Sequence, residues 1–186
     1  MIEIGNFMKV SKDQFSKDLL TYVKDNKVDT YERCVDLWGT EYLEETYNTI
    51  AIPKRATKGS AGYDFVSPVT FALDPHKTIK IPLGIRVNIK DGWFLAMFPR
   101  SSFGFNFKIM LDNTIGVIDS DYFNANNEGH IMLQITNHGD HTLYVNAGDR
   151  IVQGIFIPFG VVIGDNTDSS RTGGFGSTGI NKDLLP

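Results

Sequence analysis

The sequence predicts an all-β domain, a sandwich or barrel, preceded by a short helical extension. From about Ile50 onward, short runs rich in β-branched and aromatic residues alternate with turns that contain Gly, Pro, Asn or Asp. Many short strands at this spacing favour an all-β fold over βαβ units. Before Ile50, apolar residues recur at helical spacing instead. The 186 residues suffice for one domain with a substantial core.

Two amphipathic helices are predicted in the extension. Ser11 and Gln14 have the spacing of a capping box. The apolar residues that follow share one helical face: Phe15, Leu19, Tyr22 and Val23. A second start signal at 29–32 leads into another apolar face: Tyr31, Cys34, Val35, Trp38 and Tyr42. Helices this short are marginal alone, so they must pack on the main domain, on another subunit or on a partner.

The remaining chain divides into a β domain and a polar arm. Strands are expected over 78–81, 84–89, 93–98, 130–136, 142–145 and 150–158. From residue 161 the composition becomes small and polar, which is typical of a flexible arm. We therefore expect a helical extension at 1–47, a β domain at 48–160 and an arm at 161–186.

Composition excludes several classes of protein. A formal net charge of −4 argues against a general nucleic-acid binder. No apolar run approaches the roughly 20 residues that cross a bilayer, so no membrane association is expected. The N-terminus shows no signal peptide, and the single Cys34 cannot form an internal disulfide, which together favour a cytoplasmic location. The four His residues lack zinc spacing.

The segment 113–122 is the strongest candidate for a functional site. Asn113 and Gly116 are turn residues, and the apolar residues around Gly116 give the segment strand character. Asp119 and Tyr122 follow directly, and a carboxylate tethered to an apolar strand is usually positioned by hydrogen bonds. The alternative is a hairpin corner in which the carboxylates only cap the turn.

Four more segments, 60–64, 98–104, 147–154 and 171–179, have unusual composition. Arg100 precedes two hydroxyl residues, a combination suited to phosphate oxygens. Gln153 shares a strand face with apolar neighbours and is expected to reach a polar partner, whereas Asp149 and Arg150 suit a turn or an ion pair. The segment 171–179 contains four Gly, which let backbone N–H groups approach an anion. It lacks the Lys of a P-loop. Each segment alone is also typical of a structural turn.

Taken together and in this order, the five segments resemble the five motifs of the trimeric dUTP diphosphatases, over roughly residues 50–179. The resemblance implies a jelly-roll or barrel-like β subunit and a homotrimer whose active sites each draw on all three subunits. It implies hydrolysis of dUTP to dUMP and pyrophosphate by water attack on the α-phosphorus, which limits uracil in DNA and supplies dUMP. Mg²⁺ would be the cofactor, carried by the triphosphate and waters rather than by a protein metal site.

The resemblance also assigns roles to individual residues. Asp119 would bind the 3′-hydroxyl and act as general base, and Tyr122 would pack against the deoxyribose. Uracil would be read mainly through the backbone of the hairpin around 113–122. The residues implied to bind substrate, besides Asp119 and Tyr122, are Arg100, Ser101, Ser102, Asn113, Gly116, Val117, Ile118, Met132, Gln153, Arg171, Phe175, Gly176 and Ser177. Phe175 would cover the base, and Asp64, Asp149 and Arg150 would support the site.

Two parts of the chain depart from the family pattern. A polar loop at 123–129 replaces the short link that commonly follows the third motif, and the helical segment up to about residue 47 is absent from the common short form. Either could contact a protein partner, which leaves a regulatory binding protein on the same fold as one alternative. The other is a dCTP deaminase, where a Glu stands at the position of Gln134, whose amide cannot shuttle protons.

Overall fold

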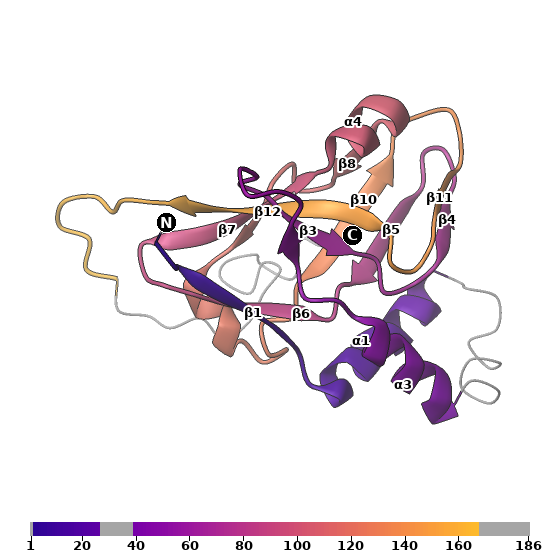
Figure 1. Cartoon of the computed structure of the whole chain (residues 1–186), viewed down its shortest axis with the longest axis horizontal. Coiled ribbons are helices and arrows are strands. Elements are labelled where there is room, and N and C mark those ends of the chain that lie inside the picture. Colours follow the sequence, from indigo (N-terminus) through magenta and orange to yellow (C-terminus); the bar gives the residue numbers. More distant parts are fainter. Residues whose placement is uncertain (1, 27–38, 168–186) are drawn as a thin grey trace, which may run out of the picture.

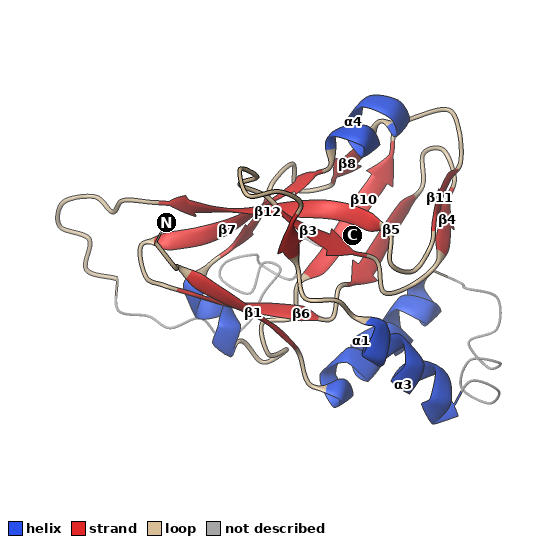
Figure 2. Cartoon of the chain, in the orientation of Figure 1, coloured by secondary structure: helices blue, strands red, loops and turns tan. Residues whose placement is uncertain are grey.

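The protein is described here by a computed structural model covering residues 2–26 and 39–167. It is mostly β-sheet with few helices, which confirms the predicted fold class (Figures 1 and 2). The elements in chain order are β1 (Gly5–Lys9), α1 (Lys12–Asp25), α3 (Gly39–Thr49), β2 (Lys54–Arg55), β3 (Tyr63–Val66), β4 (Phe71–Leu73), β5 (Thr78–Pro82), β6 (Ile85–Ile89), β7 (Trp93–Pro99), α4 (Ser101–Phe107), β8 (Ile109–Leu111), β9 (Gly116–Ile118), the 3₁₀ turn η1 (Ser120–Asn124), β10 (Met132–Asn137), β11 (Leu143–Val145) and β12 (Arg150–Pro158).

The strands form one large sheet and three smaller ones. The large sheet has the order β2-β3-β12-β7-β9, and a three-stranded sheet has the order β5-β10-β8. Two pairs, β1-β6 and β11-β4, complete the structure. All pairings are antiparallel. Figure 1 shows β12 crossing the middle of the molecule, with α1 and α3 packed together at one end.

Strand β12 is central because it pairs with β3 on one side and with β7 on the other. Gly154 in its middle allows this close approach, since a Cβ there would lie 2.9 Å from side-chain atoms of both Leu95 and Phe65. Leu95 and Phe65 are completely buried. The glycine therefore lets the core side chains of both neighbouring strands meet over the centre of the sheet.

A strand that the sequence did not predict precedes the helices. β1 pairs with β6 in the register Gly5↔Ile89 to Lys9↔Ile85. The ring of Phe7 lies 5.2 Å from that of Tyr63, 5.4 Å from Phe65 and 5.6 Å from Phe156. This aromatic cluster packs the first strand of the extension against the large sheet, so the extension is not purely helical.

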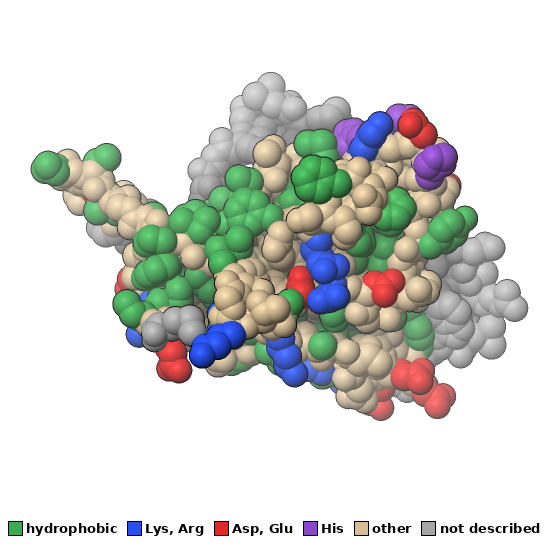
Figure 3. All heavy atoms as spheres, turned by 45° about the horizontal axis from the view of Figure 1, so that its top comes forward, with side chains coloured by type: hydrophobic (Ala, Val, Ile, Leu, Met, Phe, Trp, Pro, Cys, Tyr) green, Lys and Arg blue, Asp and Glu red, His purple; other side chains and the backbone are tan. Residues whose placement is uncertain are grey.

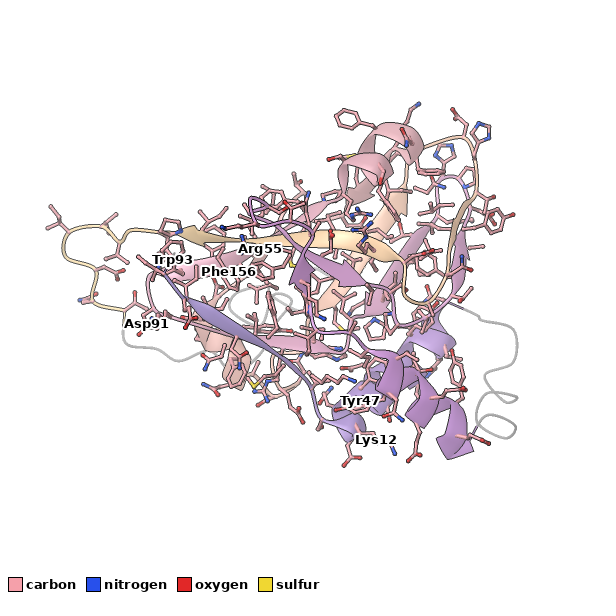
Figure 4. All side chains as sticks on the ribbon, in the orientation of Figure 1. Lys12, Tyr47, Arg55, Asp91, Trp93 and Phe156 are labelled. Atoms are coloured by element: carbon pink, nitrogen blue, oxygen red, sulfur yellow. The ribbon has the colours of Figure 1, made fainter. Side chains whose placement is uncertain are left out.

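The helices pack on the β domain of their own chain. Helix α1 begins after Ser11, whose side chain accepts a hydrogen bond from the Gln14 N–H (3.1 Å), and it buries the predicted face: Phe15, Leu19, Tyr22 and Val23. Helix α3 runs to Thr49, and the hydroxyl of its Tyr47 donates to the Val10 carbonyl (2.8 Å). Figure 4 shows Tyr47 and Lys12 at the same end of the molecule. The second predicted start signal lies outside the described residues.

The capping box at Ser11 is completed from a distant part of the chain. Gln14 does not bond back to the Ser11 N–H; its side chain donates to Asp18 Oδ2 instead (2.7 Å). The Ser11 N–H donates to Glu128 Oε2 (2.7 Å) and the Ser11 hydroxyl to Glu128 Oε1 (2.6 Å). The loop at 123–129 thus closes the N-terminus of α1, where a carboxylate is also favoured by the helix dipole.

These contacts make the stability of the protein sensitive to acid. The hydrogen bonds from the Ser11 side chain and backbone hold the pKa of Glu128 below its ordinary value of 4.5. A carboxylate with a depressed pKa in the folded state stabilises the fold above its ordinary pKa, and this contribution is lost as pH falls through the folded value. Glu128→Gln should therefore be less stable than wild type at pH 7, and the difference should shrink below about pH 4.5. Urea unfolding at several pH values would measure it; a pH-independent difference would contradict the linkage.

Candidate active site

Three of the predicted segments meet because β12 pairs with two strands at once. Gln153 on β12 lies opposite Asp64 on β3 and opposite Phe98 on β7. Arg100 follows directly after β7. The segments at 60–64, 98–104 and 147–154, separated by up to about ninety residues in sequence, are therefore neighbours at one end of the large sheet.

Asp64 connects the two arginines of this region. Its Oδ1 lies 3.2 Å from Arg100 Nε, and its Oδ2 lies 3.2 Å from Arg150 Nη1. The Asp64 side chain is only 16% exposed, whereas that of Arg150 is 52% exposed. Arg100 Nη1 also donates to the Arg150 carbonyl (3.3 Å). A half-buried carboxylate thus orients two cations whose remaining N–H groups can face an anion.

An open pocket of about 520 Å³ lies beside Arg100. It is lined by Phe98, Pro99, Arg100, Ser101, Gly104, Phe105, Gln153 and Ile155. Gln153 Nε2 donates to the Pro99 carbonyl (3.3 Å). The pocket has apolar walls with a guanidinium, a hydroxyl and an amide among its polar groups, which suits a ligand with both an anionic and an apolar part.

The residues after Arg100 form a helix that the sequence did not predict. Helix α4 begins with Ser101 and Ser102 and ends at Lys108, which adopts the left-handed conformation (φ +54°). Both serines are exposed, and Ser101 lines the pocket whereas Ser102 does not. Of the two predicted hydroxyl donors, the structure brings only Ser101 next to Gln153.

The segment 113–122 is a corner between two sheets and not a hairpin, which corrects the expected local structure. β8 pairs with β10, whereas β9 pairs with β7. The chain turns between them through Thr114, which has a left-handed backbone (φ +63°), and Gly116, where a Cβ would lie 3.0 Å from Met97 Cβ. The two strands that flank the corner therefore belong to different sheets, since β8 pairs with β10 and β9 pairs with β7.

The residues expected to contact uracil come from both sides of this corner. Asn113 and Val117 are exposed, and Gly116 and Ile118 are half-buried. The register of β8 with β10, Ile135↔Leu111 to Asn137↔Ile109, leads the chain after Leu111 toward Met132, which is half-buried. Asn113 and Met132 therefore lie toward the same end of the three-stranded sheet.

Asp119 caps the 3₁₀ turn η1, and Tyr122 lies within it. Asp119 is half-buried and stands at the N-cap position, and the Tyr122 N–H donates to its carbonyl (3.2 Å). Tyr122 is 5% exposed. Its hydroxyl donates to the His130 carbonyl (2.9 Å) and accepts from Asn127 Nδ2 (2.8 Å). The phenol ring is thus fixed at its hydroxyl end.

Within one chain, Asp119 is distant from the Arg100 pocket. Asp119 follows Ile118, which lies opposite Leu95, whereas Arg100 follows the last residue of β7. Since a strand rises about 3.3 Å per residue, the backbones of the two residues are separated by roughly 15–20 Å along β7. The structure brings Asp64, Arg100, Arg150 and Gln153 together. Asp119 and Tyr122 lie apart from them, beyond β9, whereas Gly116 lies opposite Met97 between the two.

The remaining predicted residues are a turn group and the arm. Asp149 Oδ2 accepts from the Asn146 N–H (2.8 Å), and its carbonyl accepts from the Ser67 N–H (2.8 Å), so it shapes the turn before β12. Arg171, Phe175, Gly176 and Ser177 lie outside the described residues.

The surface around the corner is unusually apolar. Exposed hydrophobic side chains occur on α4, β8 and the corner: Phe105 (87%), Met110 (49%), Ile115 (42%) and Val117 (52%). Figure 3 shows a broad hydrophobic area on one face, with basic side chains and acidic side chains next to each other beside it. Large hydrophobic side chains that are exposed on neighbouring elements are typical of a region that another molecule covers.

Residues 2–26 and 39–167 contain neither a cluster of metal-ligating side chains nor a membrane-spanning helix. No group of three or more His, Cys, Asp or Glu side chains in these ranges could hold a metal ion. No helix in the described part of the chain is long and apolar enough to span a membrane.

Comparison with known proteins identifies the family. The dUTPase family model matches residues 48–179. The deoxyuridine 5′-triphosphate nucleotidohydrolase of Lactococcus lactis is 44% identical over 133 residues, covering 70% of this chain and 89% of that protein. The corresponding protein of Hahella chejuensis is 40% identical over 142 residues, covering 71% and 89%.

Solved structures agree with this comparison. The dUTPase from Streptococcus mutans superposes with a TM-score of 0.56 at 39% identity, covering 63% of this chain and 91% of that chain. The Staphylococcus bacteriophage 80alpha dUTPase gives a TM-score of 0.54 at 18% identity, covering 67% and 93%, and supports the fold alone. By its sequence, its fold and the order of its five segments, the chain belongs to the dUTPase family.

Proposed function

We propose that this protein hydrolyses dUTP to dUMP and pyrophosphate, with the triphosphate in the Arg100 pocket of one chain and the nucleoside against the 113–122 corner of another. The observation that carries this proposal is the ion pair with Asp64, which orients the guanidinium of Arg100 at the edge of the pocket. Family membership supports the substrate, since the Lactococcus lactis relative is named for acting on deoxyuridine 5′-triphosphate.

The phosphates would be bound by side chains that donate hydrogen bonds. Arg100, Ser101 and Gln153 already lie around one pocket, and Ser102 is one residue away. A guanidinium oriented by Asp64 can stabilise negative charge that develops on the phosphate oxygens in the transition state. Arg171, Gly176 and Ser177 would reach the terminal phosphates, and Phe175 would cover the base.

Asp119 would be the general base. It would accept a proton from a water molecule whose oxygen forms a bond to the α-phosphorus, while the bond to the bridging oxygen breaks and pyrophosphate leaves with the electron pair. Asn113, Gly116, Val117, Ile118 and Met132 would contact uracil. The buried ring of Tyr122, fixed through its hydroxyl, would form a wall where a 2′-hydroxyl does not fit.

The substrate would be the Mg²⁺ complex of dUTP. The pocket offers cationic and neutral donors rather than a cluster of carboxylates, which suits an anion whose metal is held by its own phosphates and by water. Bound in this way, the metal would neutralise part of the triphosphate charge. The role of the chain's residues is then to orient the phosphates and to position the water.

The distance between Arg100 and Asp119 in one chain supports an active site that is built from more than one chain. Roughly 15–20 Å is too far for one nucleotide to place its α-phosphorus next to Asp119 and also fill the pocket of the same chain. The exposed apolar side chains around the corner, such as Ile115 and Val117, support burial against another copy. We propose a homotrimer with three such sites.

Gln134 argues against deamination of dCTP. Its side chain is exposed on β10, and Nε2 donates to Asp112 Oδ2 (2.6 Å). An amide held in this way cannot exchange protons with a substrate.

The test is pyrophosphate release from dUTP, dTTP, dCTP and UTP in the presence of Mg²⁺. We expect rapid hydrolysis of dUTP and little of the other three. Ammonia release from dCTP would favour the deaminase instead. No dUTP hydrolysis by folded protein would overturn the proposal.

Gly62 provides a test of the role of Gln153. A Cβ at this position would lie 2.7 Å from Gln153 Oε1, so Gly62→Ala should push the amide away from its place beside Arg100. Losing one hydrogen bond to phosphate should raise KM for dUTP about tenfold. Gly59→Ala is a matched control, because no atom lies within 4 Å of its Cβ. Equal KM in both variants would exclude Gln153 from binding.

A further inference from the structure

The two parts of the chain that depart from the family pattern contact each other. The family model begins at residue 48 and therefore excludes β1 and α1. The loop at 123–129 directly follows Tyr122. Ser11 of α1 binds Glu128 of this loop through two hydrogen bonds. The contact joins the N-terminal extension to the 113–122 corner of the same chain.

Glu128 in this loop has a left-handed backbone conformation, which its side-chain contacts stabilise. Glu128 has φ +59° and the next residue, Gly129, has φ +69°. Gly129 suits this conformation, but a residue with a Cβ is disfavoured there. The structure keeps Glu128 left-handed while both of its carboxylate oxygens bind Ser11. The carboxylate contact therefore offsets the unfavourable backbone.

A second contact from α1 fixes the residue that follows the loop. His130 is completely buried, and its Nδ1 lies 2.5 Å from Asp18 Oδ2. The Gly84 N–H donates to His130 Nε2 (2.7 Å). Because Nε2 accepts, the ring proton must be on Nδ1 and point at Asp18. Ser11, Gln14 and Asp18 recur at helical spacing and lie on one face of α1. Ser11 binds Glu128, Asp18 binds His130, and Gln14 supports Asp18.

The position of Asp18 is itself well defined. Burial acts to raise the pKa of this carboxyl, but hydrogen bonds from His130 and Gln14 outweigh it and hold the pKa below its ordinary value. Asp18 is therefore ionised at neutral pH and accepts from both side chains.

Both contacts lead to Tyr122. The His130 carbonyl accepts the hydroxyl of Tyr122, and Asn127 donates to the same hydroxyl. At Gly129, a Cβ would lie 2.7 Å from the Tyr122 carbonyl, so the loop passes in close contact with this residue. Displacing residues 127–130 would remove both groups that bond the hydroxyl of Tyr122, which lies in the turn capped by Asp119.

Strand β6 holds the other end of the loop. Arg86 Nη2 donates to the Phe123 carbonyl (2.6 Å), and its guanidinium lies 3.7 Å from the centre of the Phe123 ring. Arg86 lies opposite Met8 in the β1-β6 pair. The extension thus borders the loop at both ends, through β1 next to Arg86 and through α1 next to Glu128.

We propose that the N-terminal segment 5–25 positions the active-site corner of its own chain, and that Glu128 and His130 are positioning residues that act through Tyr122. The inference rests on the roles proposed above for Asp119 and Tyr122. It assigns to the extension a part in selecting deoxyribose, because a displaced Tyr122 ring would no longer exclude the 2′-hydroxyl of UTP.

Substitutions at Glu128 test this without emptying the core, since its side chain is 34% exposed. Glu128→Ala removes the contact with Ser11 and also the 4.0 Å ion pair with Arg86 Nη1. Glu128→Gly also removes it but relieves the left-handed backbone. Glu128→Gln keeps one accepting oxygen. The control is Glu44→Gln, which breaks the exposed ion pair between α3 and Lys12 without touching the loop.

The readouts are the ratio of kcat/KM for dUTP to that for UTP, and amide hydrogen exchange of residues 120–131 in the full chain. We expect the ratio to fall about tenfold in Glu128→Ala and Glu128→Gly, with a smaller fall in Glu128→Gln and none in Glu44→Gln. Exchange at 120–131 should accelerate in the same order. A fall of the kcat/KM ratio in both the Ala and the Gly variant would assign the effect to loss of the carboxylate, because the Gly variant has no backbone strain.

Two results would overturn the inference. Faster exchange with an unchanged ratio and unchanged kcat would show that the contact is only structural, and no change in either readout would show that it does not hold the loop. Failure of the proposed function is recognised separately, because wild-type protein would then release no pyrophosphate from dUTP, and the inference would fall with it.

Discussion

Replacing Asp119 by Asn is expected to lower kcat for dUTP by about 10²–10⁴-fold while changing KM by less than tenfold. The amide has nearly the shape of the carboxylate and can still accept a hydrogen bond from the 3′-hydroxyl, but it cannot take a proton from the attacking water. Pyrophosphate release measures the rate, and calorimetry with a non-hydrolysable dUTP analogue measures binding.

The control for this variant is Asp91→Asn, which changes the net charge equally in an exposed turn between β6 and β7. It should retain wild-type kinetics. An Asp119→Asn protein within tenfold of wild-type kcat would remove Asp119 as the base and direct attention to other groups at the corner.

Replacing Phe15 by Ala should lower the free energy of unfolding by about 3–5 kcal/mol. Phe15 is completely buried, its ring lies 5.9 Å from that of Tyr47 and 6.1 Å from that of His130, and it belongs to the same core as the β-sheet residues. Truncation would leave a cavity between α1, α3 and the sheets. Urea unfolding of the full chain would measure the loss.

Ile2→Ala serves as the comparison, because Ile2 is 78% exposed and belongs to the same N-terminal extension. It should change stability by no more than about 0.5 kcal/mol. A loss below about 1 kcal/mol for Phe15→Ala would mean that the extension unfolds separately from the β domain.

Sequence patterns predicted the elements whose signals are local. The face of α1 and the strand β12 agree with expectation because helical spacing and turn residues act over a few neighbours. β1 was missed because five residues with little alternation gain their strand conformation from β6, about eighty residues later. Pairing with a distant strand leaves no mark within the segment itself.

Helix α4 was missed for a different reason. Its sequence contains Gly104 and three Phe, which are poor helix formers. The helix is short, begins with bonds from the Phe103 and Gly104 N–H groups to the Arg100 carbonyl, and ends at a left-handed Lys108. Tertiary context at the end of β7 overrides the local propensity here.

The sequence predicted which residues belong to the candidate site, but it did not predict how they are arranged in space. Composition singled out Asp64, Arg100 and Gln153 separately, yet their proximity depends on the order of strands around β12, which no single segment encodes. The capping box shows the same limit. Its spacing predicted the Ser11 cap, whereas the reciprocal acceptor, Glu128, lies 117 residues away.

The separation of Arg100 from Asp119 along β7 has a genetic consequence. In an assembly with shared sites, the phosphate-binding half and the corner come from chains that can carry different alleles. Two inactive alleles, Arg100→Ala and Asp119→Asn, would then complement each other on co-expression, because some sites would receive both intact halves. By the same reasoning, one defective allele would be partly dominant, since its product would disable sites to which wild-type subunits also contribute.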